Sequence, residues 1–243
     1  MASVTILETQ GLSKSFGGLQ ANTDINFKLQ QGLITALIGP NGAGKTTFVG
    51  MLCGRIPATS GRVYFNDQDI SALPAHQRIQ LGIAYTFQIT SIFPGLTVAR
   101  NVELSLRRAK KLKTKDIADG VSQVLSQVNL VDRADQIAGD LSYGHQRILE
   151  IAMGLAQDPK LFILDEPTQG LSESEVEEFI SLIKSLAGET TILLIEHNMD
   201  VVMKSADHIA VLNFGELLAE GSPEEIRQNK SVQSAYLGTS EDA

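Results

Sequence analysis

Gly39-Pro40-Asn41-Gly42-Ala43-Gly44-Lys45-Thr46-Thr47 is the stretch that decides the fold. It has the form G-x-x-x-x-G-K-[ST], a loop whose backbone N–H groups surround the phosphates of a nucleotide. The run 34–38 before it is apolar and rich in β-branched residues, which predicts a buried strand; the pattern from Thr46 to Cys53 predicts a helix that ends before Gly54. Because glycines let the backbone approach closely and a helix N-terminus attracts anions, we expect the residues from Gly39 to Thr47 to line a triphosphate site.

Two side chains of this loop are expected to contact the triphosphate and its metal. Lys45 should reach the β- and γ-phosphates, and the hydroxyl of Thr46 should hold Mg²⁺. The alternative is a glycine-rich turn that matches the motif by chance. Motifs further along the chain argue against that alternative.

The composition is that of a soluble globular protein with one large domain, or a domain with a subdomain. The chain has 243 residues, of which 43% are hydrophobic and 20% charged. Its formal net charge of −8 argues against nucleic-acid binding, and no apolar run approaches the roughly 18 residues that cross a bilayer. Residues 1–5 lack the features of an export signal, so we expect a cytoplasmic location. Cys53, the single cysteine, excludes an internal disulfide and is expected to fill the core rather than to react.

The N-terminal part predicts short strands joined by turns. Residues 4–10 and 25–29 favour two strands of an antiparallel edge sheet, and Phe16-Gly17-Gly18 should turn between them. Further strands are expected at 62–65 and 82–87, the second of which delivers Gln88 into a loop. Phe16 either stacks on a nucleobase or fills the core, and the sequence leaves both interpretations open.

Two adjacent carboxylates close a second buried strand. The run 161–164 is continuously apolar, as in a parallel strand covered on both faces, and Asp165-Glu166 follows it. In a protein with a phosphate loop the first acid is the expected Mg²⁺ ligand, and the second is placed to polarise a water. His197 follows the next buried strand, 190–195, at the sheet edge where ligands gather, so we assign it a functional role as well.

The middle of the chain, from about 88 to 157, has a helical pattern. Ser142 is a plausible N-cap whose hydroxyl and neighbouring amides suit an anion. The apolar stretch 91–96 is either core or an exposed patch for a partner. The basic run 107–115 is either a solvated surface or a contact for acidic lipid headgroups or a partner. After the acid pair, a capping box at Ser172 predicts another helix.

The C-terminal part predicts a hairpin over 209–220. Ser222-Pro223 should then cap a C-terminal helix.

Together these motifs resemble, in order and rough spacing, an ATPase subunit of an ABC transporter, over essentially the whole chain. The family signature Leu-Ser-Gly-Gly-Gln corresponds to Leu141-Ser142-Tyr143-Gly144-His145, and its Tyr is similar to that of importer ATPases for branched-chain amino acids, urea and similar small polar solutes. Thr86-Phe87-Gln88, Glu196-His197-Asn198 and Ala235-Tyr236-Leu237-Gly238 share this similarity. The chain departs from the family at His145, where the signature has Gln, and at Ser172, where many members carry Asp.

The resemblance implies an α/β fold: a P-loop NTPase core with a mixed sheet, flanking helices and an antiparallel β edge, plus an inserted helical subdomain. We expect one domain, 1–243, with its core at 1–87 and 158–243 and the helical subdomain at about 88–157. The resemblance also implies hydrolysis of ATP with Mg²⁺. The adenine base of ATP would lie near Phe16, and Mg²⁺ would be held by Thr46, Asp165 and Gln88.

The remaining roles follow from the same resemblance. Glu166 would orient or deprotonate the attacking water, His197 would contact the γ-phosphate, and Ser142 and Gly144 would complete the ATP site of another subunit. Gln88 would join the Mg²⁺ shell or contact the attacking water, and its place between core and helical arm would let it pass the state of the γ-phosphate to the arm.

The implied partners are a second ATPase subunit (a related chain, which the resemblance favours, or a copy of this one), two membrane permeases and, indirectly, an extracytoplasmic solute-binding protein. The chain would then sit at the cytoplasmic face of the inner or plasma membrane, and 91–96 would dock a permease. No nucleic acid is expected. Three alternatives stay open: an exporter ATPase of the lipopolysaccharide type, an ATPase of iron–sulfur assembly, and a nucleotide sensor without turnover.

Overall fold

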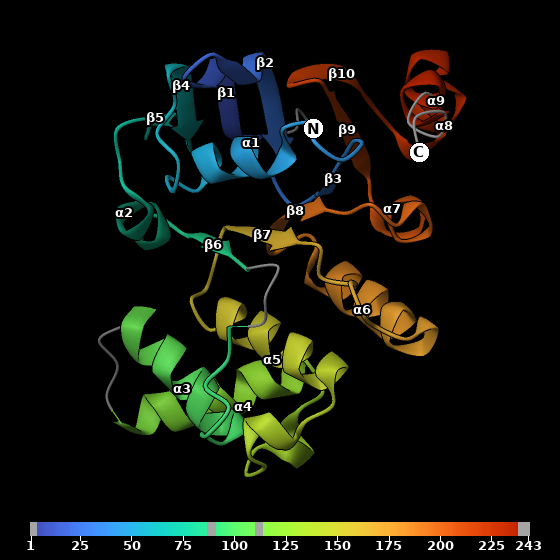
Figure 1. The fold of residues 1–243 in the computed structure, drawn as a ribbon. Coiled ribbons are helices and arrows are strands. Elements are labelled where there is room, and N and C mark those ends of the chain that lie inside the picture. Colours follow the sequence, from blue (N-terminus) through green and yellow to red (C-terminus); the bar gives the residue numbers. More distant parts are fainter. Residues whose placement is uncertain (1–3, 87–90, 110–113, 238–243) are drawn as a thin grey trace.

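The computed structural model describes residues 4–86, 91–109 and 114–237 (Figure 1). A six-stranded sheet forms its centre. In spatial order its strands are β10 (Glu216–Gly221), β9 (His208–Asn213), β3 (Ile34–Ile38), β8 (Thr191–Ile195), β7 (Leu161–Asp165) and β6 (Ile83–Tyr85). Neighbours in this sheet are parallel except β9 and β10, which form the predicted hairpin.

The second sheet is four-stranded and antiparallel, as predicted for the edge of the fold. Its strands are β2 (Leu19–Gln30), β1 (Thr5–Phe16), β4 (Ser60–Phe65) and β5 (Gln68–Asp69). β1 and β2 are longer than the predicted 4–10 and 25–29. The pairing shifts register between Thr9 and Leu12, around Gly11, and this bulge interrupts the alternation that would have revealed the rest of β1.

Helix α1 (Lys45–Leu52) lies between the two sheets (Figure 1). Its apolar side chains join those of β1, β2, β4 and one face of β3, β7 and β8 in a single buried cluster. Phe48 of α1 packs edge-to-face on Phe27 of β2, with ring centroids 5.5 Å apart. Helix α2 (Ala75–Gln80), which the sequence did not predict, supplies the buried Arg78, whose guanidinium donates to the carbonyls of Met51 and Leu52 at the end of α1.

The other face of the central sheet is covered by helices (Figure 1). α5 (Tyr143–Leu155) and α6 (Glu173–Leu186) lie next to the sheet, and α3 (Val98–Ala109) and α4 (Thr114–Gln127) pack against α5 farther from it. Short 3₁₀ turns occur at Val131–Arg133 and Ala138–Asp140. Ser142 caps α5 as predicted, accepting from the backbone N–H of His145. α5 packs closely on β7, because a Cβ on Gly154 would lie 2.3 Å from Cζ of Phe162. Where this helical part begins and ends as a unit, about 88–157, stays a prediction.

In the C-terminal part, α7 (Met199–Ser205) connects β8 to β9, and α8 (Pro223–Gln228) and α9 (Lys230–Leu237) follow β10. The predicted capping box at Ser172 is present, and the predicted cap at Ser222 is a capping box as well. The sequence predicted one terminal helix, whereas Asn229 leaves helical geometry and starts a second helix by accepting from the backbone N–H groups of Ser231 and Val232. Among the residues placed in the structure, none forms a helix that is long and apolar enough to cross a membrane.

Candidate active site

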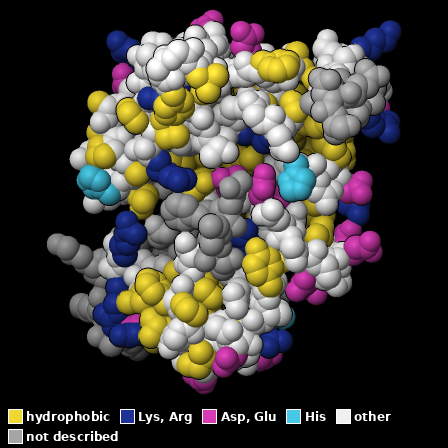
Figure 2. All heavy atoms as spheres, in the orientation of Figure 1, with side chains coloured by type: hydrophobic (Ala, Val, Ile, Leu, Met, Phe, Trp, Pro, Cys, Tyr) yellow, Lys and Arg dark blue, Asp and Glu magenta, His cyan; other side chains and the backbone are white. Residues whose placement is uncertain are grey.

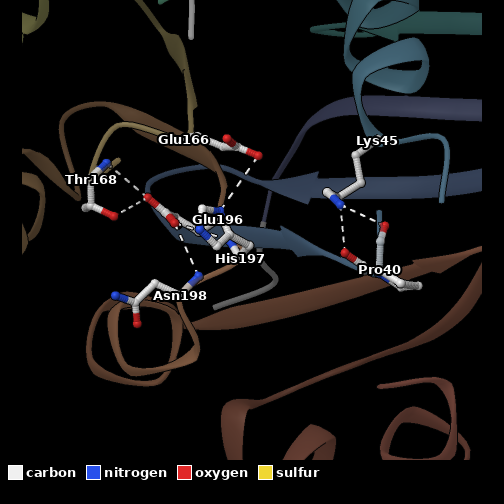
Figure 3. Close-up of polar contacts among 8 residues, drawn as sticks. Pro40, Lys45, Glu166, Thr168, Glu196, His197 and Asn198 are labelled. Carbon is white, nitrogen blue, oxygen red and sulfur yellow. Dashed lines mark hydrogen bonds and ion pairs between the residues drawn. The ribbon is translucent and has the colours of Figure 1, made fainter. Parts of the chain in front are cut away.

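The central strands β3, β7 and β8 place three segments at one edge of the sheet. The strands are parallel and adjacent, in the order β3, β8, β7, so the residues that follow their carboxyl ends meet there. Those residues are the loop 39–47 after β3, the acid pair at the end of β7, and Glu196-His197 after β8. Figure 3 shows side chains from all three segments facing a common space. This is the edge at which open α/β sheets bind ligands.

The loop 39–47 is held in place by its glycines. A Cβ on Gly39 would lie 2.1 Å from the carbonyl oxygen of Leu212 in β9. Gly44 has φ 94° at the N-cap of α1, and a Cβ there would lie 2.5 Å from the carbonyl oxygen of Ala21. Both positions therefore accept only glycine, which fixes the path of the loop between β9 and β2.

Lys45 points back along its own loop (Figure 3). Its Nζ donates to the carbonyl oxygens of Gly39, at 2.7 Å, and Pro40, at 3.1 Å. Burial lowers the pKa of Lys45, and the carboxylates of Glu166 and Asp165 oppose that effect. The ammonium group of Lys45 is thus close enough to the carboxylates of Asp165 and Glu166 to interact with them electrostatically.

The acid pair has two different environments. Asp165 is buried at the end of β7, and its Oδ2 accepts a 2.6 Å hydrogen bond from the hydroxyl of Tyr85. Burial raises the pKa of Asp165, while the Tyr85 hydrogen bond acts in the opposite direction. Glu166 is partly exposed and has φ 46°, a left-handed conformation that costs a non-glycine residue on the order of 1 kcal/mol. Its backbone N–H donates to the carbonyl of Ile195 in β8, which helps to hold that conformation.

His197 lies beside Glu166 at the rim of the site (Figure 3). Its Nδ1 is 3.8 Å from Oε1 of Glu166, and 58% of its side chain is exposed. The two side chains come from different strands and reach the same point, so both are placed to contact one bound group.

Glu196 was not assigned a role from the sequence. It is fully buried, and its carboxylate accepts hydrogen bonds from Thr168, His197 and Asn198. The available signal was a second acid directly after an apolar run, at 191–195, the same pattern that identified Asp165. Tyr85 was also missed, because a tyrosine at a strand end carries no signal by itself.

An open pocket of about 710 Å³ runs from the loop to the antiparallel sheet. The residues that line it are Phe16, Leu19, Gln20, Ala21, Asn41, Gly42, Ala43, Gly44, Lys45, Thr46, Thr47, Glu166, Phe214 and Gly215. Phe16 is 49% exposed, and Nζ of Lys14 lies 4.8 Å from its ring centroid. Its ring is therefore not a core aromatic, and its stacking on a nucleobase stays a prediction.

Three other residues were predicted to belong to the site. Gln88 is outside the described residues. Ser142 and Gly144, at the start of α5, do not line the pocket. A Cβ on Gly144 would lie 2.1 Å from Oε1 of Glu175 in α6, and Nδ1 of His145 is 2.7 Å from the hydroxyl oxygen of Ser142. The helix start is thus packed against α6 rather than turned to Lys45.

The donors near the loop fit a magnesium ion carried by a nucleotide. Thr46 offers a hydroxyl and Asp165 a carboxylate, the oxygen ligands that Mg²⁺ prefers. Mg²⁺ is usually bound by one or two carboxylates together with substrate phosphates, rather than by a cage of protein groups. Within residues 4–86, 91–109 and 114–237, no cluster of three or more His, Cys, Asp or Glu side chains that could hold a metal ion occurs.

Comparison with known proteins identifies the family. The sequence model of the protein family described as ABC transporter matches residues 22–169. A second family model, described as branched-chain amino acid ATP-binding cassette transporter, matches residues 216–242. The first match covers more than half of the chain. The chain therefore belongs to the ABC transporter family, and its mixed α/β fold is that of the family's P-loop ATPase cassettes.

Individual relatives extend over the whole chain. BraF of Pseudomonas aeruginosa, a high-affinity branched-chain amino acid transport ATP-binding protein, is 38% identical, with 96% of this chain and 98% of BraF covered. LivG of Escherichia coli K12, which has the same description, is 39% identical, with 97% and 99% covered. The ADP conformation of MJ1267, an ATP-binding cassette of an ABC transporter, superposes with a TM-score of 0.86 at 29% identity, covering 97% of this chain and all of MJ1267. The resemblance deduced from the sequence motifs is confirmed.

Proposed function

We propose that this chain binds and hydrolyses ATP to drive uptake of branched-chain amino acids, or of related small polar solutes such as urea and other amides, through partner membrane permeases. The observation that carries the proposal is the meeting of Lys45 with the acid pair Asp165-Glu166 at one sheet edge. The descriptions of BraF and LivG support the transport role and the class of solute.

ATP would bind with its phosphates in the loop 39–47 and its base against Phe16, since both line the same pocket. Lys45 would exchange the carbonyls of Gly39 and Pro40 for the β- and γ-phosphates. Thr46 and Asp165 would hold Mg²⁺, with Gln88 joining them. When bound, this ion neutralises charge on the phosphates.

Hydrolysis would use the two side chains at the rim. Glu166 orients a water and accepts its proton as the water oxygen attacks the γ-phosphorus, and the bond to the ADP oxygen breaks. His197, 3.8 Å from Glu166, contacts the γ-phosphate from the neighbouring strand. The protein thus contributes positioning and charge, which is what phosphoryl transfer needs.

A second ATPase subunit would complete the site. Ser142 and Gly144 do not line the pocket of their own chain, so we propose that they contact the ATP bound by the partner, whether a related chain or a copy. Ser142 stands at the N-terminus of α5, whose amides and dipole suit a phosphate.

The permease is proposed to dock at a groove of about 480 Å³ between α2, β6 and the helices α3 and α5. Phe93, from the apolar stretch 91–96, lines this groove and is 51% exposed, whereas Ile92 packs against the helical core. Arg108, from the basic run 107–115, also lines it, while Arg107 is paired with Glu103. Figure 2 shows basic and apolar side chains side by side over the helical part. The chain would then be peripheral at the cytoplasmic face of the membrane, and a solute-binding protein would act through the permeases.

The test is phosphate release by the purified chain with ATP and Mg²⁺, compared with Lys45→Ala. We expect turnover in the wild-type protein and none above background in the variant, because the loop loses its only side-chain cation. Equal rates would contradict the proposed site. ATP binding without turnover in the wild type would favour a nucleotide sensor, and a chain that stimulates export or iron–sulfur assembly instead of amino-acid uptake would contradict the solute class.

A further inference from the structure

A fully buried carboxylate, that of Glu196, joins the two loops that carry Glu166 and His197 (Figure 3). We propose that Glu196 is a positioning residue for the hydrolysis reaction: it fixes the loop after β7 to the loop after β8 and so holds Glu166 and His197 at one point. This inference rests on the proposed function, since it assigns Glu196 a part in the same site.

Each oxygen of Glu196 serves one loop. Oε1 accepts from the backbone N–H and the hydroxyl of Thr168, at 3.1 and 2.6 Å. Oε2 accepts from the backbone N–H groups of His197 and Asn198, at 3.1 and 3.4 Å. The carboxylate therefore bridges two segments that come from different strands, β7 and β8.

The chemistry of these contacts requires a carboxylate. All its partners are donors, and an ionised carboxylate is a pure acceptor with lone pairs for each of them. A glutamine of the same shape would turn an NH₂ group toward one loop, leaving N–H donors opposed to N–H donors in a buried place. Polar atoms are costly to bury unless they are hydrogen-bonded, and both oxygens of Glu196 are satisfied by these four contacts.

The bridge ends close to both reacting side chains. Pro167 alone separates Glu166 from Thr168, and His197 directly follows Glu196. The left-handed backbone conformation of Glu166 persists only if its surroundings hold it in place. Glu196 contributes to this by accepting hydrogen bonds from Thr168, two positions after Glu166. Loosening the bridge should therefore displace Glu166 and His197 relative to each other without disturbing the phosphate loop.

The experiment compares Glu196→Gln, Thr168→Val and Thr168→Ser with the wild-type chain, in steady-state ATP hydrolysis and in backbone amide exchange. For Glu196→Gln we expect kcat to fall about 10-fold or more, because small displacements of reacting groups have large costs, while KM for ATP changes less than about twofold. The amides of Thr168, His197 and Asn198 should all exchange faster. Thr168→Val should lose part of the rate, and Thr168→Ser, which keeps the hydroxyl donor, should restore most of it.

Asp207→Asn is the matched control. Asp207 also accepts a backbone N–H, that of Ile34 at 2.9 Å, but at the opposite end of β3. This variant should lower the unfolding midpoint without changing kcat. A second comparison uses the Glu166→Gln background, in which Glu196→Gln should cost much less, because the group it positions is already lost.

Several results would overturn the inference. One is an unchanged kcat in Glu196→Gln; another is an equal loss of rate in the wild-type and Glu166→Gln backgrounds, which would indicate a general loss of structure. If Glu196→Gln does not fold, Thr168→Val decides by the same readouts. Absence of ATP turnover in the wild type would count against the proposed function, and unchanged exchange of the three amides would then still refute the bridge.

Discussion

The phenolic hydroxyl of Tyr85 donates a 2.6 Å hydrogen bond to Oδ2 of Asp165, across the neighbouring parallel strands β6 and β7. The guanidinium of Arg55 lies 5.0 Å from the centroid of the same ring. Burial, together with the bond to Asp165, raises the pKa of Tyr85, so the hydroxyl stays protonated and remains a donor. The bond also opposes the rise that burial imposes on the pKa of Asp165, and it orients the carboxylate that we propose as a Mg²⁺ ligand.

Tyr85→Phe should therefore weaken the response to magnesium. Removing a group that orients a metal ligand typically costs 10- to 100-fold in metal affinity or activity, so we expect half-maximal ATP hydrolysis to need about 10-fold more Mg²⁺. The measurement is phosphate release over a range of Mg²⁺ at saturating ATP. Tyr64→Phe, on β4 of the antiparallel sheet, serves as control. An unchanged Mg²⁺ dependence in Tyr85→Phe would show that Asp165 needs no such support.

Glu166→Gln should separate binding from hydrolysis. The amide keeps the shape of the side chain but accepts no proton, so we expect ATP to bind as in the wild type and to be hydrolysed roughly 10²-fold more slowly. Equilibrium dialysis with ATP and phosphate release measure the two quantities. Glu173→Gln, an exposed acid at the start of α6, should change neither. Normal hydrolysis in Glu166→Gln would place the general base elsewhere.

The phosphate loop and the acid pair were predictable because their chemistry is local. A short loop between a strand and a helix, and acids after an apolar run, are visible in the sequence itself. The strand order was not: β3 lies between β8 and β9, which follow it by more than 150 positions in the numbering. Tyr85 and Asp165 are 80 residues apart, and Thr168 and Glu196 are 28 apart, so neither pair exists before the sheet is assembled. Phe16 was ambiguous for the same reason, since its exposure depends on what packs around it.

Replacing Ile92 and Phe93 by alanine should uncouple ATP hydrolysis from transport. The exposed ring of Phe93 lines the proposed docking groove, so its loss should weaken the permease contact, whereas the ATP site is built from other segments. We expect uptake into vesicles with the reconstituted permeases to fall while hydrolysis by the isolated chain stays near the wild-type rate.

Ile92 packs on the helical core, so its replacement in the double variant can also lower the stability of the chain. The single variant Phe93→Ala removes only the exposed ring, so a loss of uptake in this variant reports on docking to the permease. Val131→Ala removes an apolar side chain of similar exposure, 48%, outside the groove and should leave uptake unchanged. Wild-type uptake in the double variant would refute docking at this groove.

Cys53 should remain unreactive until the protein unfolds. Burial raises the pKa of its thiol to about 12, from an ordinary value of 9.0, and the positive charges of Arg55 and Arg78 only partly oppose this. Since the thiolate is the reactive form, a thiol reagent at pH 8 should modify Cys53 in denaturant but not in the native chain. Rapid modification of the native protein would contradict the assignment of Cys53 to the core.

The same pKa shift makes a prediction about stability and pH. Because the folded thiol holds its proton more tightly than the unfolded one, its contribution is complete below pH 9 and is lost as the pH rises from 9 to about 12. Between pH 8 and 10.5 the wild-type chain should therefore lose on the order of 2 kcal/mol more unfolding free energy than Cys53→Ala, which has no thiol to titrate. Urea unfolding at the two pH values measures the difference, and other titrating groups cancel because they are common to both chains. Parallel pH dependences would show that Cys53 ionises as easily in the folded chain as in the unfolded one.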